Sequence, residues 1–319
     1  NGAEGVVDGA DVALAPHRVD VLWATRGVLS ENGSPGFLLM NEKYISEGRV
    51  LFTVIGDSNQ ENKVLQKEGN VLLGVYDEAD NLLWTWHIWM CDTPQRQGYK
   101  NGFSVHDRDL GAIEYSPFAA KDNQAAIDGL YYQWGRPTPF LIGNNRQDVA
   151  ISGVSIDDTE GVPLAERIVH PEKFYDSRLE EAALPHLWGW RSVKDEYVQT
   201  IYDPCPPGYR VPSNRLWREL KLAHEPHIGQ SVSGVENNHA IHFKVDAYSD
   251  IFYPVSGYYY NNNGALWNKG YSDVNYDMEG AAYMWAATYN AVDQNPYNLK
   301  YERLGEKTVG EFTVASSLH

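Results

Sequence analysis

Between residues 21 and 92 the hydrophobic pattern is that of β-strands. Residues 70–76 and 81–90 are rich in β-branched and aromatic side chains, and they flank the turn-forming residues 77–80. Two such runs around a short loop predict an antiparallel hairpin. Because both faces of the second run carry bulky side chains, we expect that strand to lie in the centre of a sheet. Residues 49–55 predict a further strand.

The middle of the chain, residues 93–200, is interrupted by glycine and proline at short intervals. Long elements do not fit between such residues, so mostly irregular structure is expected there. Two helices are predicted: residues 177–184, capped by Ser177, and residues 213–223. In the second helix the apolar positions recur at helical spacing, and Trp217 beside them is expected to pack beneath a sheet.

The last quarter of the chain combines strand candidates with a polar aromatic segment. Residues 250–255 and 281–289 predict strands, and residues 257–276 between them are rich in tyrosine, asparagine and glycine. Flat rings stack on sugar faces and amides hydrogen-bond to hydroxyl groups. The candidate ligand-binding residues are therefore Tyr258, Tyr259, Tyr260, Asn262, Trp267 and Tyr271. The ordinary alternative is that these rings pack the segment onto its own domain.

A second pattern in this segment is an alternation of oxygen-bearing side chains. Asp273, Asn275 and Asp277 follow one another at every second position, in the order that a calcium-binding loop uses. The EF-hand pattern is not met, because Met278 and Met284 stand where it requires glycine and glutamate. Calcium is the candidate metal, a polar strand edge or loop is the alternative, and no other cofactor is expected.

Composition excludes several classes of protein. The chain has 319 residues, of which 43% are apolar, and 26 Lys plus Arg against 43 Asp plus Glu give a formal net charge of −17. Such a chain can fold around a core, and its charge would repel phosphate backbones, so nucleic acid is not expected as a partner. No apolar run approaches the ~20 residues of a membrane-spanning helix.

Candidate catalytic residues are few. The sequence contains no Gly-x-Ser-x-Gly, His-Glu-x-x-His or glycine-rich phosphate-binding motif. The acidic pairs Asp157–Asp158 and Glu180–Glu181 would suit a glycosidase, but a solvated acidic face is the ordinary interpretation. His87 lies in an aromatic strand, where a base or a ligand is one interpretation and a hydrogen-bonded core histidine is the commoner one. We therefore expect a protein that is not an enzyme.

Several short motifs occur in order along the chain. They are LLWTWHIWMCD (82–92), HDRDLGAIE (106–114), YYQWGRPTPF (131–140), IYDPCPPGYRVP (201–212), YPVSGYYYNNNGAL (253–266) and AAYMWAATY (281–289). In this order and at this spacing, the set resembles the Fibrobacter succinogenes major paralogous domain of fimbrillin-like surface proteins and lipoproteins of Bacteroidetes. The resemblance covers about residue 70 to the end. That family is regarded as a relative of the C-type-lectin-like fold, and residues 208–220 are similar to the segment that opens a helix in the related formylglycine-generating enzymes.

The resemblance implies a fold and a location. The expected fold class is α+β, with a β-rich amino-terminal part at residues 1–92 and a lectin-like domain at residues 93–319. The amino terminus shows no basic and apolar leader, and the family implies export to the outer surface or the periplasm after removal of a signal. The expected function is that of an adhesin or binding module, associated with fimbriae, for a glycan or a surface protein. An envelope enzyme acting on polysaccharide and a structural pilus component are the alternatives.

Two cysteines, Cys91 and Cys205, allow one disulfide at most. Members of the family often end in an Arg-Cys pair that would partner the cysteine of the Asp-Pro-Cys-Pro motif, whereas residues 315–319 contain none. Cys205 is therefore expected either to be free or to pair with Cys91. Formylglycine-generating chemistry needs a thiolate pair near the carboxyl terminus, and no cysteine follows Cys205.

Overall fold

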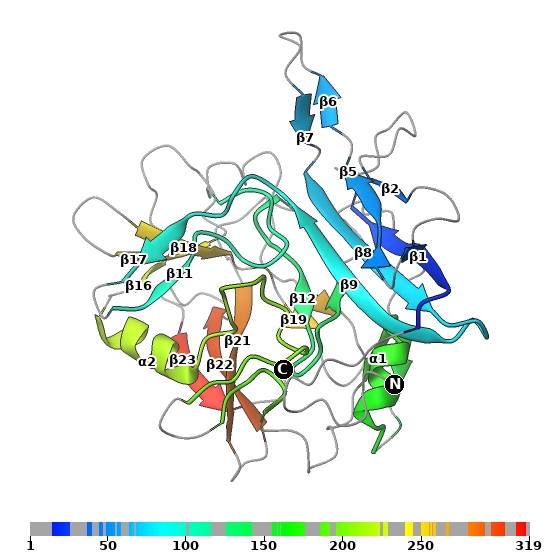
Figure 1. Ribbon diagram of the computed structural model, residues 1–319. Helices are drawn as coiled ribbons and strands as arrows, with labels where there is room; N and C mark the ends of the chain where they lie inside the picture. Colours follow the sequence, from blue (N-terminus) through cyan, green and yellow to red (C-terminus); the bar gives the residue numbers. More distant parts are fainter. Residues whose placement is uncertain are drawn as a thin grey trace.

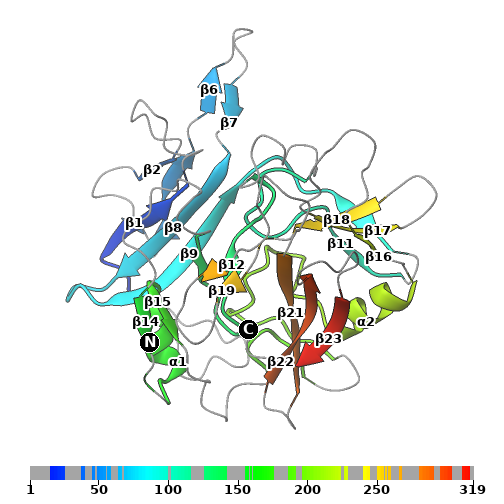
Figure 2. The same cartoon turned by 180° about the vertical axis from the view of Figure 1, so that it is seen from behind.

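A computed structural model gives the architecture of the chain (Figures 1 and 2). It describes residues 15–25, 37–39, 45–46, 49–54, 56–58, 64–66, 68–99, 102–115, 126–141, 155–157, 159, 161–175, 186–191, 196–223, 226–228, 240–244, 250–254, 256, 258–259, 266–267, 280–290, 295–303 and 311–316. These residues form mostly small antiparallel β-sheets with few helices, so the fold is β-rich. None of the helices within them is long and apolar enough to cross a membrane.

Strands dominate the amino-terminal part. They are β1 (Arg18–Ala24), β2 (Phe37–Leu39), β3 (Ile45–Ser46), β4 (Arg49–Val50), β5 (Phe52–Val54), β6 (Gly56–Ser58), β7 (Val64–Gln66), β8 (Gly69–Tyr76) and β9 (Leu82–Met90). The order β1-β8-β9 forms a three-stranded sheet, and β2–β5, β3–β4 and β6–β7 form two-stranded ribbons. The strand predicted at residues 49–55 is thus divided into β4 and β5, which pair with different partners.

Short elements fill the middle of the chain, and longer strands close it. The middle contains β10 (Arg96–Gly98), β11 (Ser104–His106), β12 (Tyr131–Tyr132), β13 (Pro139–Phe140), β14 (Ser155–Asp157), α1 (Leu164–Val169) and β15 (Lys173–Tyr175). The remainder contains α2 (Asn214–Ala223), β16 (Pro226–Ile228), β17 (Ala240–Lys244), β18 (Asp250–Pro254), β19 (Tyr258–Tyr259), β20 (Leu266–Trp267), β21 (Gly280–Asn290), β22 (Asn295–Arg303) and β23 (Glu311–Ser316).

The hairpin predicted before residue 92 is confirmed as β8 and β9, which pair antiparallel along their length. Its turn is held by the Asp77 carboxylate, whose Oδ1 accepts hydrogen bonds from the backbone N–H groups of Ala79 and Asn81, each at 2.9 Å. Bonds from Asn81 lower the pKa of Asp77. Side chains that bond to their own turn in this way favour the tight reversal.

The expectation that the second strand of the hairpin is central is wrong: β8 lies in the middle of the described sheet and β9 at its edge. The inner face of β9 is bulky because it packs on later segments of the chain. Thr85 Oγ1 lies 2.7 Å from Thr138 Oγ1, and the Trp89 indole N–H donates to the Ala112 carbonyl at 3.0 Å. The bulky side chains of β9 are therefore accommodated by contacts with these later segments. They do not require a further strand beside β9, as had been expected.

The predicted helix at residues 213–223 is confirmed as α2, and the predicted strands at 250–255 and 281–289 are confirmed as β18 and β21. Trp217 packs beneath the sheet as expected: its indole N–H donates to the Trp285 carbonyl in β21 at 3.2 Å, and its ring meets Tyr253 edge-on. The Thr288 hydroxyl accepts from the Asn214 backbone N–H at the start of α2. The helix predicted at 177–184 lies outside the described residues, and α1 was not predicted.

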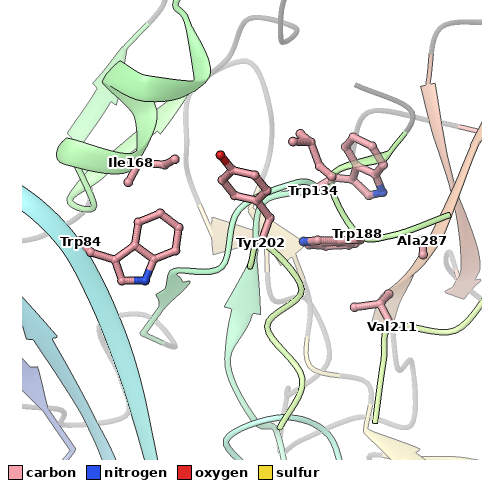
Figure 3. Packing of buried hydrophobic residues seen from close by; sticks show 8 residues of the cluster. Trp84, Trp134, Ile168, Trp188, Tyr202, Val211 and Ala287 are labelled. Carbon is pink, nitrogen blue, oxygen red and sulfur yellow. The ribbon is translucent and has the colours of Figure 1, made fainter. Parts of the chain in front are cut away.

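The larger hydrophobic cluster joins segments from both sides of residue 92. Its buried members are Trp84, Trp134, Ile168, Leu187, Trp188, Tyr202, Val211 and Ala287. In Figure 3, Trp84 of β9 and Ile168 of α1 lie on one side of Tyr202, and the rings of Trp134 and Trp188 lie on the other, towards β21. A second cluster, between β1 and β8, contains Val19, Val71 and Leu73. The domain boundary at residue 92 stays a prediction, but β9 shares its core with the later part.

Gly189 is a sensitive point of the backbone. It has φ +85°, and an added Cβ would lie 2.5 Å from the Val198 carbonyl oxygen and 2.6 Å from a Tyr197 ring carbon. Gly189→Ala should therefore lower the free energy of unfolding by about 3 kcal/mol in urea denaturation. Gly208→Ala, with φ +87° but open space, should lose about 1 kcal/mol. Gly98, which has neither constraint, serves as the control, and equal losses at all three positions would contradict the packing described.

Candidate functional site

The best sequence candidates for ligand contact fall on a two-stranded ribbon, β19 with β20. Its register pairs Tyr258 with Trp267 and Tyr259 with Leu266. Three of the predicted ligand-binding residues, Tyr258, Tyr259 and Trp267, are therefore brought together by backbone pairing. The other three, Tyr260, Asn262 and Tyr271, lie outside the described residues.

The ribbon is attached to the rest of the protein at its start. The Tyr131 hydroxyl donates a hydrogen bond to the Ser256 carbonyl, two residues before β19, and β19 contacts β21. In both overall views β19 lies close to β12, the strand that carries Tyr131 (Figures 1 and 2). Two segments distant in sequence therefore fix the position at which the aromatic segment leaves the core.

The predicted calcium ligands Asp273, Asn275 and Asp277 lie outside the described residues. Among the residues that the structure describes, no group of three or more His, Cys, Asp or Glu side chains is arranged to hold a metal ion. The calcium hypothesis stays a prediction.

His87 is the centre of a partly buried chain of hydrogen bonds. The Asn70 side-chain amide donates to the Gly111 carbonyl at 2.8 Å, which turns its Oδ1 towards His87 Nε2 at 2.9 Å. His87 Nε2 must then carry the proton, and Nδ1 accepts from the Tyr132 hydroxyl at 3.3 Å. Both ring nitrogens have partners, as expected for a core histidine.

The order Tyr132, His87, Asn70 matches a nucleophile, a base and an orienting residue. The pKa values oppose that chemistry. Burial lowers the pKa of His87 to about 3 and raises that of Tyr132 well above its usual value. Moving the phenol proton to such a base costs about 10 kcal/mol even for a tyrosine of ordinary pKa. The chain of hydrogen bonds therefore orders the core and supplies no general base.

The Asp-Pro-Cys-Pro motif is organised by the buried carboxylate of Asp203. Its oxygens accept from the backbone N–H groups of Cys205 at 2.9 Å and Val211 at 3.3 Å, and from the Tyr197 hydroxyl. These bonds fold residues 203–211 into a compact loop ahead of α2. The hydrogen bonds to Asp203 thus give this motif a structural role.

Both cysteines are free thiols, so the alternative of a Cys91–Cys205 bridge is not realised. Burial raises the pKa of Cys91 to about 11 and that of Cys205 well above its usual value. Because the thiolate is the nucleophilic form, neither side chain is prepared for covalent catalysis.

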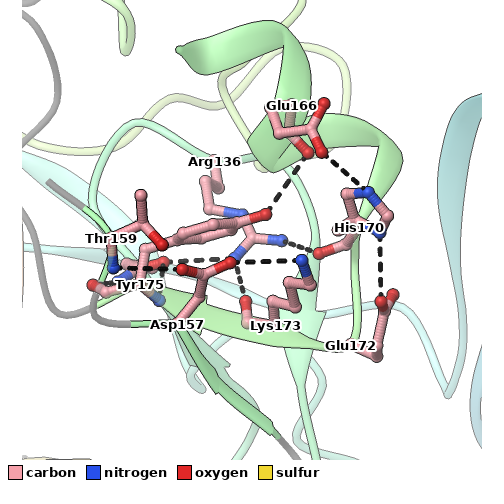
Figure 4. A network of polar contacts seen from close by, with 9 residues as sticks. Arg136, Asp157, Thr159, Glu166, His170, Glu172, Lys173 and Tyr175 are labelled. Atoms are coloured by element: carbon pink, nitrogen blue, oxygen red, sulfur yellow. Dashed lines mark hydrogen bonds and ion pairs between the residues drawn. The ribbon is translucent and has the colours of Figure 1, made fainter. Parts of the chain in front are cut away.

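Two further motifs are also explained by buried arginines. In HDRDLGAIE, Arg108 bonds in a forked geometry to Asp107 and reaches Asp92 at 2.6 Å. In YYQWGRPTPF, Arg136 is 1% exposed and donates to the carbonyls of Lys173 at 2.7 Å and His170 at 3.3 Å. Figure 4 shows this guanidinium directed into the loop before β15, beside the Tyr175 ring. Both arginines also hold backbone, because Arg108 donates to the Ile113 carbonyl at 3.2 Å as Arg136 does to its two carbonyls.

A polar contact that the sequence did not reveal joins Tyr99 and Tyr253. The two phenols are buried and hydrogen-bonded to each other, and burial raises the pKa of both. Nearby in the sequence, Asp109 is partly buried, and loss of hydration raises the pKa of its carboxyl to about 7. Tyr253 lies far along the chain from Tyr99, so no local motif could have identified their contact.

No protein-family model, curated protein or solved structure matches this chain.

Neutral His87 makes the protein sensitive to acid. Its pKa is lower in the folded state, about 3, than in the unfolded chain, so stability is lost as pH falls from about 6.5 towards 3. Between pH 7 and 4.5 this group should remove about 2 kcal/mol. His87→Gln should reduce the measured loss by that amount in urea unfolding at the two pH values. His170→Gln, at the surface, is the control, and a pH profile unchanged by His87→Gln would contradict the assignment.

Proposed function

We propose that the chain is a non-catalytic binding module of the cell envelope, of C-type-lectin-like fold, that recognises a glycan or a cell-surface protein. One observation carries the proposal: the register of β19 and β20 sets Tyr258 directly opposite Trp267. Opposed residues of an antiparallel pair lie on the same face of the ribbon. Tyrosine and tryptophan are the residue types whose rings stack on sugar rings, and the register puts one position of each type opposite the other.

The attachment of the ribbon supports this proposal. The bond from Tyr131 to the Ser256 carbonyl and the contact of β19 with β21 hold the start of the segment in place. A ribbon held in this way loses less conformational freedom on binding than a free loop does, so more of the stacking energy appears as affinity.

The polar clusters support the non-catalytic part of the proposal. The relay through His87 offers a base of pKa about 3, and burial keeps the thiols of Cys91 and Cys205 protonated. The carboxylate of Asp203 accepts hydrogen bonds from Tyr197, Cys205 and Val211. Each of these candidate catalytic groups therefore has a structural role in the folded protein.

Charge and motifs define the ligand and the location that we propose. A net charge of −17 disfavours sulfated and sialylated glycans and favours neutral or cationic ones. The proposed location, on the outer surface or in the periplasm after signal removal, and the proposed association with fimbrial subunits are supported by the ordered motifs between residues 82 and 289.

Trp267→Ala tests the stacking surface. The purified chain is first applied to an array of host and bacterial glycans, and the affinity for the best glycan is then measured by calorimetry. Removal of the indole should weaken binding by at least about tenfold, since a ring contact of ~1.4 kcal/mol corresponds to that factor. Trp86→Ala is the matched control, because Trp86 is 37% exposed on β9, outside the ribbon, and should leave affinity unchanged.

The array experiment separates the alternatives. Binding that is lost with a chelator would add calcium at Asp273, Asn275 and Asp277 to the site. Absence of binding to every glycan would overturn the glycan proposal in favour of a protein-binding or structural surface component. Release of reducing sugar from a bound polysaccharide would overturn the non-catalytic proposal.

A further inference from the structure

Four exposed arginines lie on neighbouring segments of a chain that is acidic as a whole. They are Arg96 in β10, Arg210 in the loop ahead of α2, and Arg215 and Arg218 in α2 itself. We call these four residues the basic surface. The complete chain carries 43 Asp plus Glu against 26 Lys plus Arg, so cations gathered in one place run against its overall charge.

The β10–β11 hairpin is the centre of the basic surface. Its register pairs Arg96 with His106, and the centroid of the His106 ring lies 3.5 Å from that of Tyr209. Arg210 follows Tyr209 directly in the loop. A single pair of contacting rings therefore links the position of Arg96 to that of Arg210.

The same hairpin also meets the start of α2. The guanidinium carbon of Arg215 lies 5.6 Å from the centroid of the Phe103 ring. The next residue, Ser104, accepts a hydrogen bond from Arg96 Nε at 2.8 Å. Arg218 is about one helical turn beyond Arg215, and residues at this spacing share a face of a helix. β11 and α2 lie near each other in both overall views (Figures 1 and 2).

Within the described part of the chain, no carboxylate neutralises Arg96, Arg210 or Arg218. The cations that form ion pairs there are Arg18, Arg108, His170 and Lys173. Arg96 bonds to a hydroxyl, and the guanidinium carbon of Arg210 lies 4.2 Å from the centroid of the Tyr197 ring. A guanidinium has five N–H donors, so these contacts leave most of them to solvent or to a ligand.

The basic surface is open to an approaching chain. Gly98 lies two residues from Arg96 and on the same face of the hairpin, and a Cβ added to it would meet nothing within 4 Å. The same is true of Gly208, next to Tyr209 in the loop. The backbone of a partner can therefore come close to both segments, within reach of the guanidinium groups.

Exposed aliphatic side chains border the basic surface. Val198 is 46% exposed and Ile201 is 40% exposed. Their segment runs beside the loop, because the Gln199 side-chain amide donates to the Tyr209 carbonyl at 3.4 Å. Aliphatic contacts suit the side chains of another protein better than the hydroxyl-covered surface of a polysaccharide, and arginine and tyrosine are enriched where proteins bind one another.

We propose that the basic surface is a second binding site, other than the β19–β20 ribbon, for an acidic segment of a partner protein. Carboxylates of that segment pair with Arg96, Arg210 and Arg218, and its apolar side chains contact Val198 and Ile201. At physiological ionic strength charges are screened beyond about 8 Å, so the local cations outweigh the net negative charge of the chain. The site does not rest on the proposed glycan binding, because its residues lie outside the ribbon.

Binding of an acidic peptide to the full chain tests this site. The probe is a fluorescently labelled peptide of glutamate with interspersed leucine, measured by anisotropy, and the same peptide with glutamine in place of glutamate is its uncharged counterpart. The wild-type chain should bind the glutamate peptide only. The triple variant Arg96→Gln, Arg210→Gln, Arg218→Gln should bind it about tenfold more weakly, since three exposed ion pairs together account for about that factor.

Two variants serve as matched controls. Arg49→Gln removes an exposed arginine of β4, outside the basic surface, and should leave the affinity for the peptide unchanged. Trp267→Ala, which alters the β19–β20 ribbon, should also bind the peptide as the wild type does. The two sites therefore succeed or fail independently.

Salt gives a test that needs no variant. Raising NaCl from about 50 to about 500 mM should weaken peptide binding by the wild-type chain at least about tenfold. No binding of the glutamate peptide at low salt, binding that is independent of salt, or a triple variant with wild-type affinity would each overturn the site. Preference for polygalacturonate over the peptide, lost in the triple variant, would also overturn it, because the surface would then bind an anionic glycan.

Discussion

Tyr132 connects the two halves of the molecule, one through its side chain and the other through its backbone. Its hydroxyl donates to His87 in β9, and its backbone carbonyl accepts the indole N–H of Trp285 in β21 at 2.8 Å. The amino-terminal hairpin and the carboxyl-terminal sheet thus meet on one short strand, β12. Because burial holds His87 neutral and Tyr132 protonated, this connection is made entirely by neutral groups and needs no ion pair.

Several tryptophan side chains also connect distant segments through hydrogen bonds between neutral groups. The indole N–H groups of Trp89, Trp134 and Trp217 donate to backbone carbonyls in distant segments, at 3.0, 3.0 and 3.2 Å. Each ring packs against its neighbours while its N–H group donates to the carbonyl of a segment distant in sequence. The abundance of tyrosine and tryptophan is therefore, in large part, the means by which a chain of small sheets builds a core. The rings on β19 and β20 are the ones for which we propose a different role.

Local periodicity predicted the elements whose own sequence determines them. The hairpin of β8 and β9 and the helix α2 follow from alternation and from helical spacing, and both are confirmed. The position of β9 at the sheet edge was not predictable, since its bulky inner face packs on Thr138 and Ala112, which lie far along the chain. Composition identified the segment that contains Tyr258 and Trp267, but the pairing of these two residues is known only from the structure. The unusual pKa of Asp109 depends on residues that only tertiary structure brings together.

β9 and β21 belong to one core that is joined through Tyr132, and such a core should open cooperatively. The most direct test is segment-resolved hydrogen exchange of the most protected amides in β8–β9 and in β21–β22, across a series of low denaturant concentrations. One core predicts that both sets converge on the same opening free energy and the same dependence on denaturant. Separate isotherms, with the β1-β8-β9 sheet opening at lower free energy while β21–β22 stays protected, would contradict the account.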